Sequence, residues 1–355
     1  MPASGQLRIL ARCALLALPL AVLAVLYILL DPFKVLRGYA DYYPGSVGVF
    51  PNRDWVSSRI LLSRTAERPD AFIFGNSRSM AFETRDWAPL LAPDARPYHF
   101  DASLESLYGV WAKVRYLDQH GYGLRHVLII VDADLLRQAD HADQRALFRK
   151  TPDIDRSSPL EFQLAFAEAF LSRGFFVKYC DFAFTGRQRG YMAGAIEKRL
   201  FRHDPWTNDL SFQPLEEEVA AEGEEFHRSR RAVFDAPIAG AGTPTPAVIG
   251  LPQRSRLEDL QKIFQARRTD LRIVVSPLYD RRPLAEGDRH ALQTLFGAAH
   301  VFDYSGTNDV TKDRRNYYEA SHYRIRVARE ILQQIYRRPG GGGAPRPDSL
   351  RLRQQ

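Results

Sequence analysis

The sequence predicts an α/β fold: a doubly wound, mostly parallel five-stranded sheet, with a helical insertion and one N-terminal transmembrane helix. Two observations lead to this prediction. Short apolar runs alternate with longer amphipathic segments, as they do in repeated strand–helix–strand units. In addition, an uncharged run near the N-terminus is long enough to cross a bilayer.

Five apolar runs are predicted to be the strands of the sheet. The run HVLIIV at 126–131 is the strongest, because it has six consecutive residues rich in β-branched types. Such continuous hydrophobicity is typical of strands that are covered on both faces. The predicted strands cover 71–74, 96–100, 126–131, 271–277 and 299–305.

Helices are expected between these strands. Residues 106–121 form an amphipathic segment that ends at a glycine, as helices often do. Ser255 and Glu258 have the S-x-x-E spacing of a capping box, so the next helix should open at Ser255. The segment 322–336 has an apolar face made of Ile325, Ala328, Leu332 and Ile335.

The N-terminal run, residues 13–30, contains no charged side chain. As a helix it would reach roughly 27 Å, about the thickness of the hydrocarbon core of a bilayer. Arg8 and Arg12 precede it and favour a cytoplasmic N-terminus, although Lys34 and Arg37 follow it and weaken the asymmetry. A cleaved signal peptide is the alternative, but no small-x-small cleavage site follows the run. An uncleaved anchor is therefore favoured, with the rest of the chain outside the cytoplasmic membrane.

The predicted organisation follows from these segments. The middle of the chain interrupts the strand–helix alternation and is taken as an insertion, and the Gly- and Pro-rich end as a disordered tail. The parts are a cytoplasmic N-terminus (1–12), the anchor (13–30), a connector (31–67), the α/β domain (68–337) with its insertion at about 140–250, and the tail (338–355).

Composition excludes several classes of function. The two cysteines are too few for a disulfide framework, and the nine histidines lack metal-ligand spacing, so neither a metal nor a cofactor is expected. The formal charge of +7 is spread along the chain without a nucleic-acid-binding module, so no nucleic acid partner is expected. An anionic envelope polymer or a lipid surface would suit this charge.

The residues that could carry chemistry follow the first predicted strand. Ser77 stands just past the strand end, where parallel α/β sheets place functional groups. A serine hydroxyl needs a base to become a nucleophile, and the base is usually a histidine oriented by an acid. His322 is the candidate base, at the start of the last predicted helix. Glu319 is the candidate acid, and Asp303 competes for that role.

These residues resemble the motifs of the SGNH (GDSL-type) hydrolases. Gly75-Asn76-Ser77-Arg78-Ser79 is similar to the first block, which carries the nucleophilic serine, and EASHY at 319–323 is similar to the last block, which carries the base. The similarity covers about 68–135 and 255–337, and it implies a flavodoxin-like sheet and a serine esterase or acyltransferase activity. The layout of the chain, with one N-terminal helix before the domain, is similar to that of the membrane-anchored members. These are the D-alanyl transfer and alginate O-acetylation proteins, which act beside a membrane-bound O-acyltransferase.

The chain departs from the family at the positions that hold the oxyanion. Ala102 and Ser103 occupy the place of the glycine of the second block, whose backbone N–H is the donor. Asp132 stands where the third block has an asparagine, and an ionised carboxylate would repel an oxyanion. Asn76 is the local candidate to replace that donor, and Arg78 is a candidate to bind an anionic substrate group.

Two functional hypotheses follow. The first is an envelope-facing, single-pass enzyme of the bacterial inner membrane, which acts with Ser77, His322 and Glu319 on an acylated polysaccharide or cell-envelope polymer. The residues do not separate hydrolysis from transfer. The second hypothesis is a non-catalytic glycan-binding protein or an accessory of a membrane-bound O-acyltransferase.

Overall fold

The computed structural model describes residues 3–141 and 145–337. The described residues form two compact units, of which the first contains 3–52, 145–147 and 158–198, and the second contains 53–141, 148–157 and 199–337. The stretch 140–250, predicted as an insertion, contributes to both units. The predicted tail, 338–355, lies outside the described residues.

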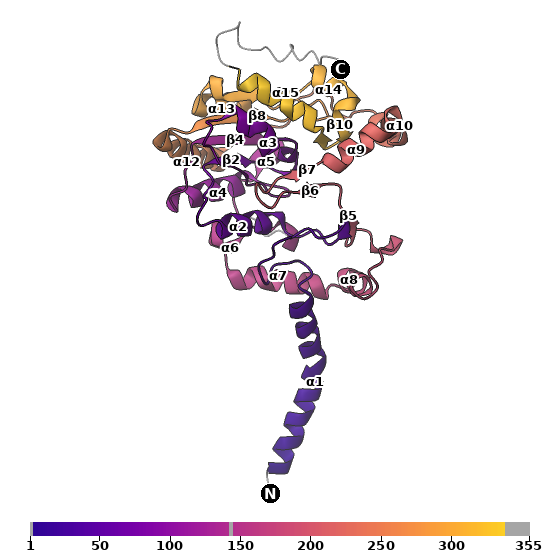
Figure 1. Ribbon diagram of the computed structural model, residues 1–355. Coiled ribbons are helices and arrows are strands. Elements are labelled where there is room, and N and C mark those ends of the chain that lie inside the picture. The colour runs from indigo at the N-terminus through magenta and orange to yellow at the C-terminus, as the bar shows by residue number, and fades with distance from the viewer. Residues whose placement is uncertain (1–2, 142–144, 338–355) are drawn as a thin grey trace. The chain divides into compact units, whose positions relative to one another are not determined.

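The second unit contains the predicted parallel sheet, which confirms the α/β fold (Figure 1). Its strands run in the order β3-β2-β4-β8-β9, and every neighbouring pair is parallel. Numbered along the chain, this is the order 2-1-3-4-5 of a flavodoxin-like doubly wound sheet. The strands are β2 (Ala71–Phe74), β3 (Pro97–His99), β4 (His126–Val131), β8 (Asp270–Val275) and β9 (Val301–Asp303).

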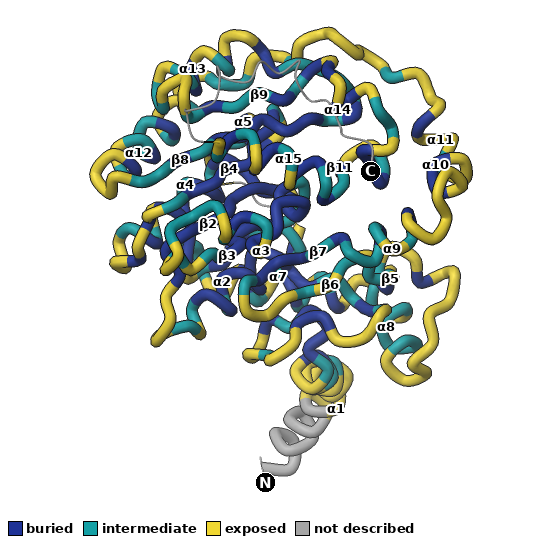
Figure 2. Tube along the Cα trace, turned by 45° about the horizontal axis from the view of Figure 1, so that its top comes forward, coloured by how far each residue is buried: buried dark blue, intermediate teal, exposed yellow. Residues whose placement is uncertain are grey.

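The central strands are buried along their length, as Figure 2 shows for β2 and β4. On one face, Ile73, Leu128 and Val274 pack in a core that includes α15 (Ile325–Ile335). Alternate residues of a strand point to the opposite face, which α4 (Leu107–Gln119) and α12 (Leu251–Arg267) cover (Figure 1). Cover on both faces explains why the strands are continuous apolar runs.

The remaining elements of the second unit surround this sheet. Its longer helices are α2 (Arg53–Ser63), α9 (Gln213–Glu222) and α13 (Glu286–Phe296). The shorter helices are η1 (Ser77–Ala81), α3 (Thr84–Trp87), α5 (Ala133–Arg137), α6 (Pro152–Asp155), α10 (Glu224–Ser229), α11 (Arg231–Phe234) and α14 (Asp309–Lys312). Two small antiparallel pairs, β6 (Arg202–His203) with β7 (Leu210–Ser211) and β10 (Tyr317–Glu319) with β11 (His322–Tyr323), complete it.

The start of α12 differs from the prediction. The helix begins at Leu251, four residues before the Ser255 that was expected to cap it, and Gly250 is its N-cap. Pro252 in the first turn has the φ angle that a helix start requires and needs no N–H partner there. The Gln253 side chain accepts the Gly250 N–H at 3.1 Å and closes the cap from inside the helix. Ser255 is therefore an interior helix residue.

The first unit combines α1 (Ala3–Leu30) with α7 (Pro159–Leu171), α8 (Arg173–Thr185) and a short antiparallel pair, β1 (Val47–Gly48) with β5 (Glu197–Lys198). Aromatic side chains hold it together. Tyr27, in the last turn of α1, packs on Phe170 at 5.3 Å between ring centroids, and Phe33 packs on Phe166 at the same distance. Among the described residues, no helix is long and apolar enough to span a membrane.

Gly75 is held by close packing at the end of β2. A Cβ atom there would lie 2.8 Å from Ser79 Cβ and 3.0 Å from the Ile130 carbonyl oxygen. We expect Gly75→Ala to lower the free energy of unfolding by about 1–3 kcal/mol, because the backbone of two elements must move. Urea unfolding, with midpoint and slope both measured, tests this expectation.

The matched control is Gly287→Ala in α13. No atom lies within 4 Å of a Cβ at this glycine, which is helical. Alanine should therefore leave stability unchanged or raise it by up to about 1 kcal/mol. If both substitutions changed the free energy of unfolding equally, close packing would not explain why position 75 is a glycine.

Candidate active site

The candidate nucleophile stands on a short turn after the first core strand. β2 ends at Phe74, Gly75 passes beside β4, and η1 begins at Ser77. The side chain of Asn76 caps η1 by accepting the Arg78 N–H at 3.0 Å. The polar residues after the strand are therefore a helix start, which presents the Ser77 hydroxyl at the carboxyl edge of the sheet.

Ser77, His322 and Glu319 form one hydrogen-bonded line. Ser77 Oγ lies 2.8 Å from His322 Nε2, although the two residues are 245 positions apart. His322 Nδ1 is bonded to Glu319 Oε1, and the second oxygen of this carboxylate accepts the Ser321 N–H at 2.9 Å. A carboxylate only accepts, so Nδ1 carries a proton and Nε2 can accept the Ser77 hydroxyl proton.

The Glu319 carboxylate is held in its ionised form. Partial burial by itself would raise its pKa, but the hydrogen bonds from His322 and from the Ser321 N–H outweigh this effect. The positive charge of Arg78 acts in the same direction, and the pKa of Glu319 lies below its ordinary value. An ionised acid in this place orients the ring and stabilises an imidazolium.

His322 and Glu319 belong to a hairpin and not to the last helix. Glu319 ends β10, His322 begins β11, and the two residues are register partners across an irregular turn. α15 begins only at Ile325, so the prediction that His322 opens this helix is wrong. The hairpin places the two side chains next to each other because they are a cross-strand pair.

Asp303, the competing candidate acid, forms hydrogen bonds within its own loop. Its carboxylate accepts the Ser305 N–H at 2.9 Å and the Ser305 hydroxyl at 2.6 Å. Among the described residues it has no hydrogen bond to His322. The geometry therefore selects Glu319.

Asp132 is a hydrogen-bond acceptor for the nucleophile turn. Its Oδ2 accepts from Asn76 Nδ2 at 2.8 Å and from Arg78 Nη1 at 2.7 Å, and its Oδ1 accepts the Leu135 N–H at 2.9 Å. The Asp132 side chain is 3% exposed, and its charge is matched by Arg78. Asn76 and Arg78 thus each donate a hydrogen bond to Asp132, while the buried Arg78 Nε has no hydrogen-bond partner among the described residues.

Of the other oxyanion candidates, Ala102 is already bonded. Its N–H donates to the Gly75 carbonyl at 3.3 Å, which ties the end of β3 to the nucleophile turn. Within the described part of the chain, the N–H groups of Ser77 and Ser103 have no acceptor. These two amides are the donors that remain for a developing oxyanion.

Two residues of the middle segment contact the β10–β11 hairpin and the residue after it, and no sequence motif includes them. The ring of Phe212 lies 5.3 Å from the ring of His322. Glu216, in α9, accepts hydrogen bonds from Arg324 and from the Tyr318 hydroxyl, on the two sides of the Glu319–His322 pair. Only the acidic run at 216–218 hinted at Glu216, and no sequence spacing pairs it with Arg324.

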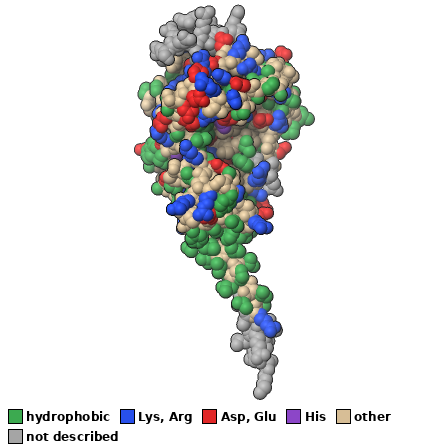
Figure 3. Space-filling model, turned by 90° about the vertical axis from the view of Figure 1, so that its right-hand side faces the viewer, with side chains coloured by type: hydrophobic (Ala, Val, Ile, Leu, Met, Phe, Trp, Pro, Cys, Tyr) green, Lys and Arg blue, Asp and Glu red, His purple; other side chains and the backbone are tan. Residues whose placement is uncertain are grey.

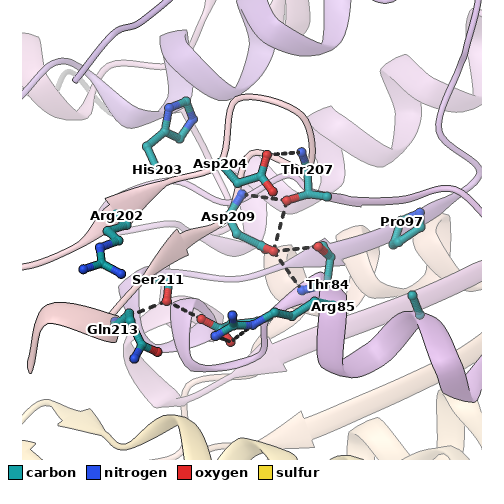
Figure 4. Close-up of a pocket in the computed structure, with 12 residues that line it drawn as sticks. Thr84, Arg85, Pro97, Arg202, His203, Asp204, Thr207, Asp209, Ser211 and Gln213 are labelled. Atoms are coloured by element: carbon teal, nitrogen blue, oxygen red, sulfur yellow. Dashed lines mark hydrogen bonds and ion pairs between the residues drawn. The ribbon is translucent and has the colours of Figure 1, made fainter. Parts of the chain in front are cut away.

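Two cavities lie near these residues. One of about 140 Å³ borders Asp132, Ser276 and Ser305, at the carboxyl ends of β4, β8 and β9. A larger one of about 300 Å³ lies between α3, the start of β3 and the β6–β7 hairpin, and polar side chains line most of it (Figure 4). Within the described residues, no cluster of His, Cys, Asp and Glu could hold a metal ion.

Asp132→Asn keeps the shape of the side chain, but it removes the charge that pairs with Arg78. Because Arg78 is only 17% exposed, we expect the free energy of unfolding to fall by about 1–3 kcal/mol. We also expect the reaction of Ser77 with a fluorophosphonate to become slower. Asp134→Asn is the control, since this carboxylate is 65% exposed and lies 4.0 Å from Arg78. Faster labelling of Asp132→Asn would show that a missing asparagine donor limits the site.

Comparison with known proteins leaves the site to be judged on its geometry. No model of a protein family matches the chain, and no curated protein matches it either. The hydrogen-bonded line from Ser77 through His322 to Glu319 is therefore the main evidence on function.

Proposed function

We propose that this protein is a serine esterase or O-acyltransferase of the SGNH type, with Ser77 as nucleophile, His322 as base and Glu319 as the orienting acid. One observation carries the proposal: Ser77 Oγ lies 2.8 Å from His322 Nε2, while His322 Nδ1 is bonded to Glu319. The flavodoxin-like strand order and the position of Ser77 at the switch point between β2 and β4 support it.

In the first step Ser77 Oγ attacks the carbonyl carbon of an ester. The hydroxyl proton passes to His322 Nε2, and the imidazolium is stabilised by the ionised Glu319. The tetrahedral oxyanion is held by the amide N–H groups of Ser77 and Ser103. The ester C–O bond then breaks, and His322 returns the proton to the leaving alcohol, so that an acyl-Ser77 intermediate remains.

In the second step an oxygen nucleophile releases the acyl group. Water gives hydrolysis, and a hydroxyl group of an acceptor gives transfer. In both cases His322 takes the proton of the attacking oxygen and returns it to Ser77 as the acyl–oxygen bond breaks. Asp132 does not oppose the oxyanion with a full charge, because Arg78 lies 2.7 Å from its carboxylate.

The substrate class we propose is an acylated polysaccharide or another cell-envelope polymer. The resemblance to the D-alanyl transfer and alginate O-acetylation proteins supports it, and so does the net charge of +7, which suits an anionic polymer. A membrane-bound O-acyltransferase is the partner that this resemblance implies.

We further propose that α1 holds the protein at a lipid surface, with the second unit on the periplasmic side. Its apolar side chains support this placement, because those described between Leu15 and Leu29 include eight large ones that are at least half exposed (Figure 3). Exposed apolar area of this extent needs cover, and acyl chains supply it.

The catalytic assignment is tested by labelling with a fluorophosphonate. The probe should phosphonylate Ser77 Oγ with release of fluoride, and Ser77→Ala should abolish labelling. Ser77→Ala should also lower hydrolysis of p-nitrophenyl acetate by at least about 10³-fold, because the residues of such a triad act as a unit. The control is Ser63→Ala, whose hydroxyl only donates to the Ile60 carbonyl within α2, at 2.8 Å. Unlabelled wild-type protein would reject the catalytic proposal.

The membrane proposal is tested on the full chain with phospholipid vesicles. We expect the protein to float with the vesicles and to resist extraction by carbonate. Arginine at both Leu18 and Val22 should release it, because each charge in the lipid core costs about 3 kcal/mol. Leu160→Arg is the matched control, since Leu160 in α7 is 67% exposed and Leu18 is 56% exposed. Release of the wild type by carbonate would overturn the proposal.

A further inference from the structure

A second serine–histidine–carboxylate line lies buried behind the first. Ser79 Oγ is 2.9 Å from His99 Nε2, and His99 Nδ1 is 3.0 Å from Asp209 Oδ1. The three residues come from η1, the end of β3 and the segment just before β7. Ser79 and His99 have no exposed surface and Asp209 is 7% exposed, so this serine cannot meet a substrate.

Ser79 forms hydrogen bonds with the backbone of the turn that contains Ser77, on the buried side of that turn. Its hydroxyl lies 2.8 Å from the Asn76 carbonyl oxygen, and its N–H donates to the same oxygen at 2.9 Å. These contacts close the turn 76–79 that contains Ser77. A 3₁₀-helix has three residues per turn, so residues two apart point to different sides. Ser77 therefore faces His322 while Ser79 faces His99.

The partners of Asp209 are hydrogen-bond donors, which stabilise a carboxylate. Its Oδ2 accepts the Thr84 N–H at 3.0 Å, the Thr84 hydroxyl at 2.6 Å and the Thr207 hydroxyl at 3.1 Å (Figure 4). A carboxylate with three donors on one oxygen has no need of its own proton. His99 Nδ1 must then carry the proton that is shared with Oδ1.

Whether His99 Nε2 donates or accepts depends on the Ser79 hydroxyl, which has only one proton to donate. When it donates to the Asn76 carbonyl, His99 Nε2 must donate to Ser79 Oγ, and the ring is an imidazolium. In this state the hydroxyl has a hydrogen bond with both Asn76 and His99. Burial of such a charge requires a paired, fully hydrogen-bonded site, which Asp209 supplies.

The surrounding charges balance an imidazolium. Arg53 pairs with the buried Asp101 at 2.7 Å. Although burial would raise the pKa of Asp101, the charges of Arg53 and His99 hold it below its ordinary value. Lys113 and Lys150 each form ion pairs with both Glu105 and Asp54. With His99 charged, the four carboxylates Asp54, Asp101, Glu105 and Asp209 face four cations, Arg53, His99, Lys113 and Lys150.

We propose that Ser79, His99 and Asp209 form a buried positioning relay, which holds the turn 76–79 so that the Ser77 hydroxyl stays aligned with His322. The relay acts through Ser77 and touches no substrate. The expected effect on rate rests on the proposed function. The hydrogen bonds among the three residues do not depend on that function. Loss of the relay should lower kcat and leave KM nearly unchanged, since substrate contacts are kept.

The kinetic test compares Ser79→Ala and Asp209→Asn with the wild type, on p-nitrophenyl acetate and on the fluorophosphonate. Misplacement of a reacting group by about 1 Å can cost 10²-fold, so we expect kcat and the labelling rate to fall by about 10- to 100-fold. Thr311→Val is the control, because its buried hydroxyl donates only to backbone of its own loop. A change in KM alone, or rates equal to the control's, would overturn the proposal.

A spectroscopic test separates the relay from the proposed function. In ¹⁵N NMR of the full chain, His99 should show two protonated ring nitrogens, and Asp209→Asn should convert it to the neutral form. Ser79→Ala should shift the His322 Nε2 signal, because Ser77 Oγ moves. If wild type fails to react with the fluorophosphonate but these signals behave as expected, the proposed function fails and the relay stands. A neutral His99 together with an unchanged His322 signal would overturn the relay.

Discussion

The carboxylate of Asp132 is the constraint on which the candidate site depends. It accepts from the side chains of Asn76 and Arg78, after β2, and from the Leu135 N–H at the start of α5. One buried group therefore joins the ends of the two central strands to the helix that follows. Ser77 lies between the two residues that Asp132 holds, so the position of the nucleophile is set by this ion pair and its hydrogen bonds. A buried charge in this role is tolerated because Arg78 matches it.

His322 and Glu319, the proposed base and acid, depend on a different part of the chain. Their hairpin, β10–β11, is short and irregular, and a two-stranded ribbon of this size is not stable alone. Glu216 of α9 holds it through Tyr318 and Arg324, and Phe212 packs against the ring of His322. Burial would raise the pKa of Glu216, but its hydrogen bonds with Arg324 and Tyr318 hold this pKa below its ordinary value. The contact between Glu216 and Arg324 is therefore an ion pair at neutral pH. The middle segment thus contacts the β10–β11 hairpin directly.

Most polar groups around Ser77 belong to connected sets of hydrogen bonds, and Arg78 Nε is a buried donor that has no partner among the described residues. Ser77 belongs to a line that ends on Glu319, Ser79 to a line that ends on Asp209, and Asp132 closes the turn between them. In a low-dielectric interior an unpaired group is costly, whereas satisfied networks confine the structure to one arrangement. A turn held from three sides has little freedom to move, which is the condition a preorganised nucleophile requires.

The sequence alone determined the sheet, because five apolar runs are long, continuous and separated by amphipathic segments. It also indicated Ser77, His322 and Glu319, since each belongs to a short motif with local signals. It did not determine the helix start at Leu251, where Pro252 and Gly250 outweighed the S-x-x-E spacing. The placement of His322 on a strand was likewise missed, because strands of two or three residues leave no periodic pattern.

Only the tertiary structure decided the partners of the polar residues. An anion at Asp132 is explained only by its contacts with Arg78 and Asn76, and no motif pairs Ser79 with His99. Glu216 and Asp209 come from the middle segment, more than 100 residues from Arg324 and His99 along the chain. Side-chain pairing at such separations is set by how the chain folds back on itself, and no local pattern in the sequence records it.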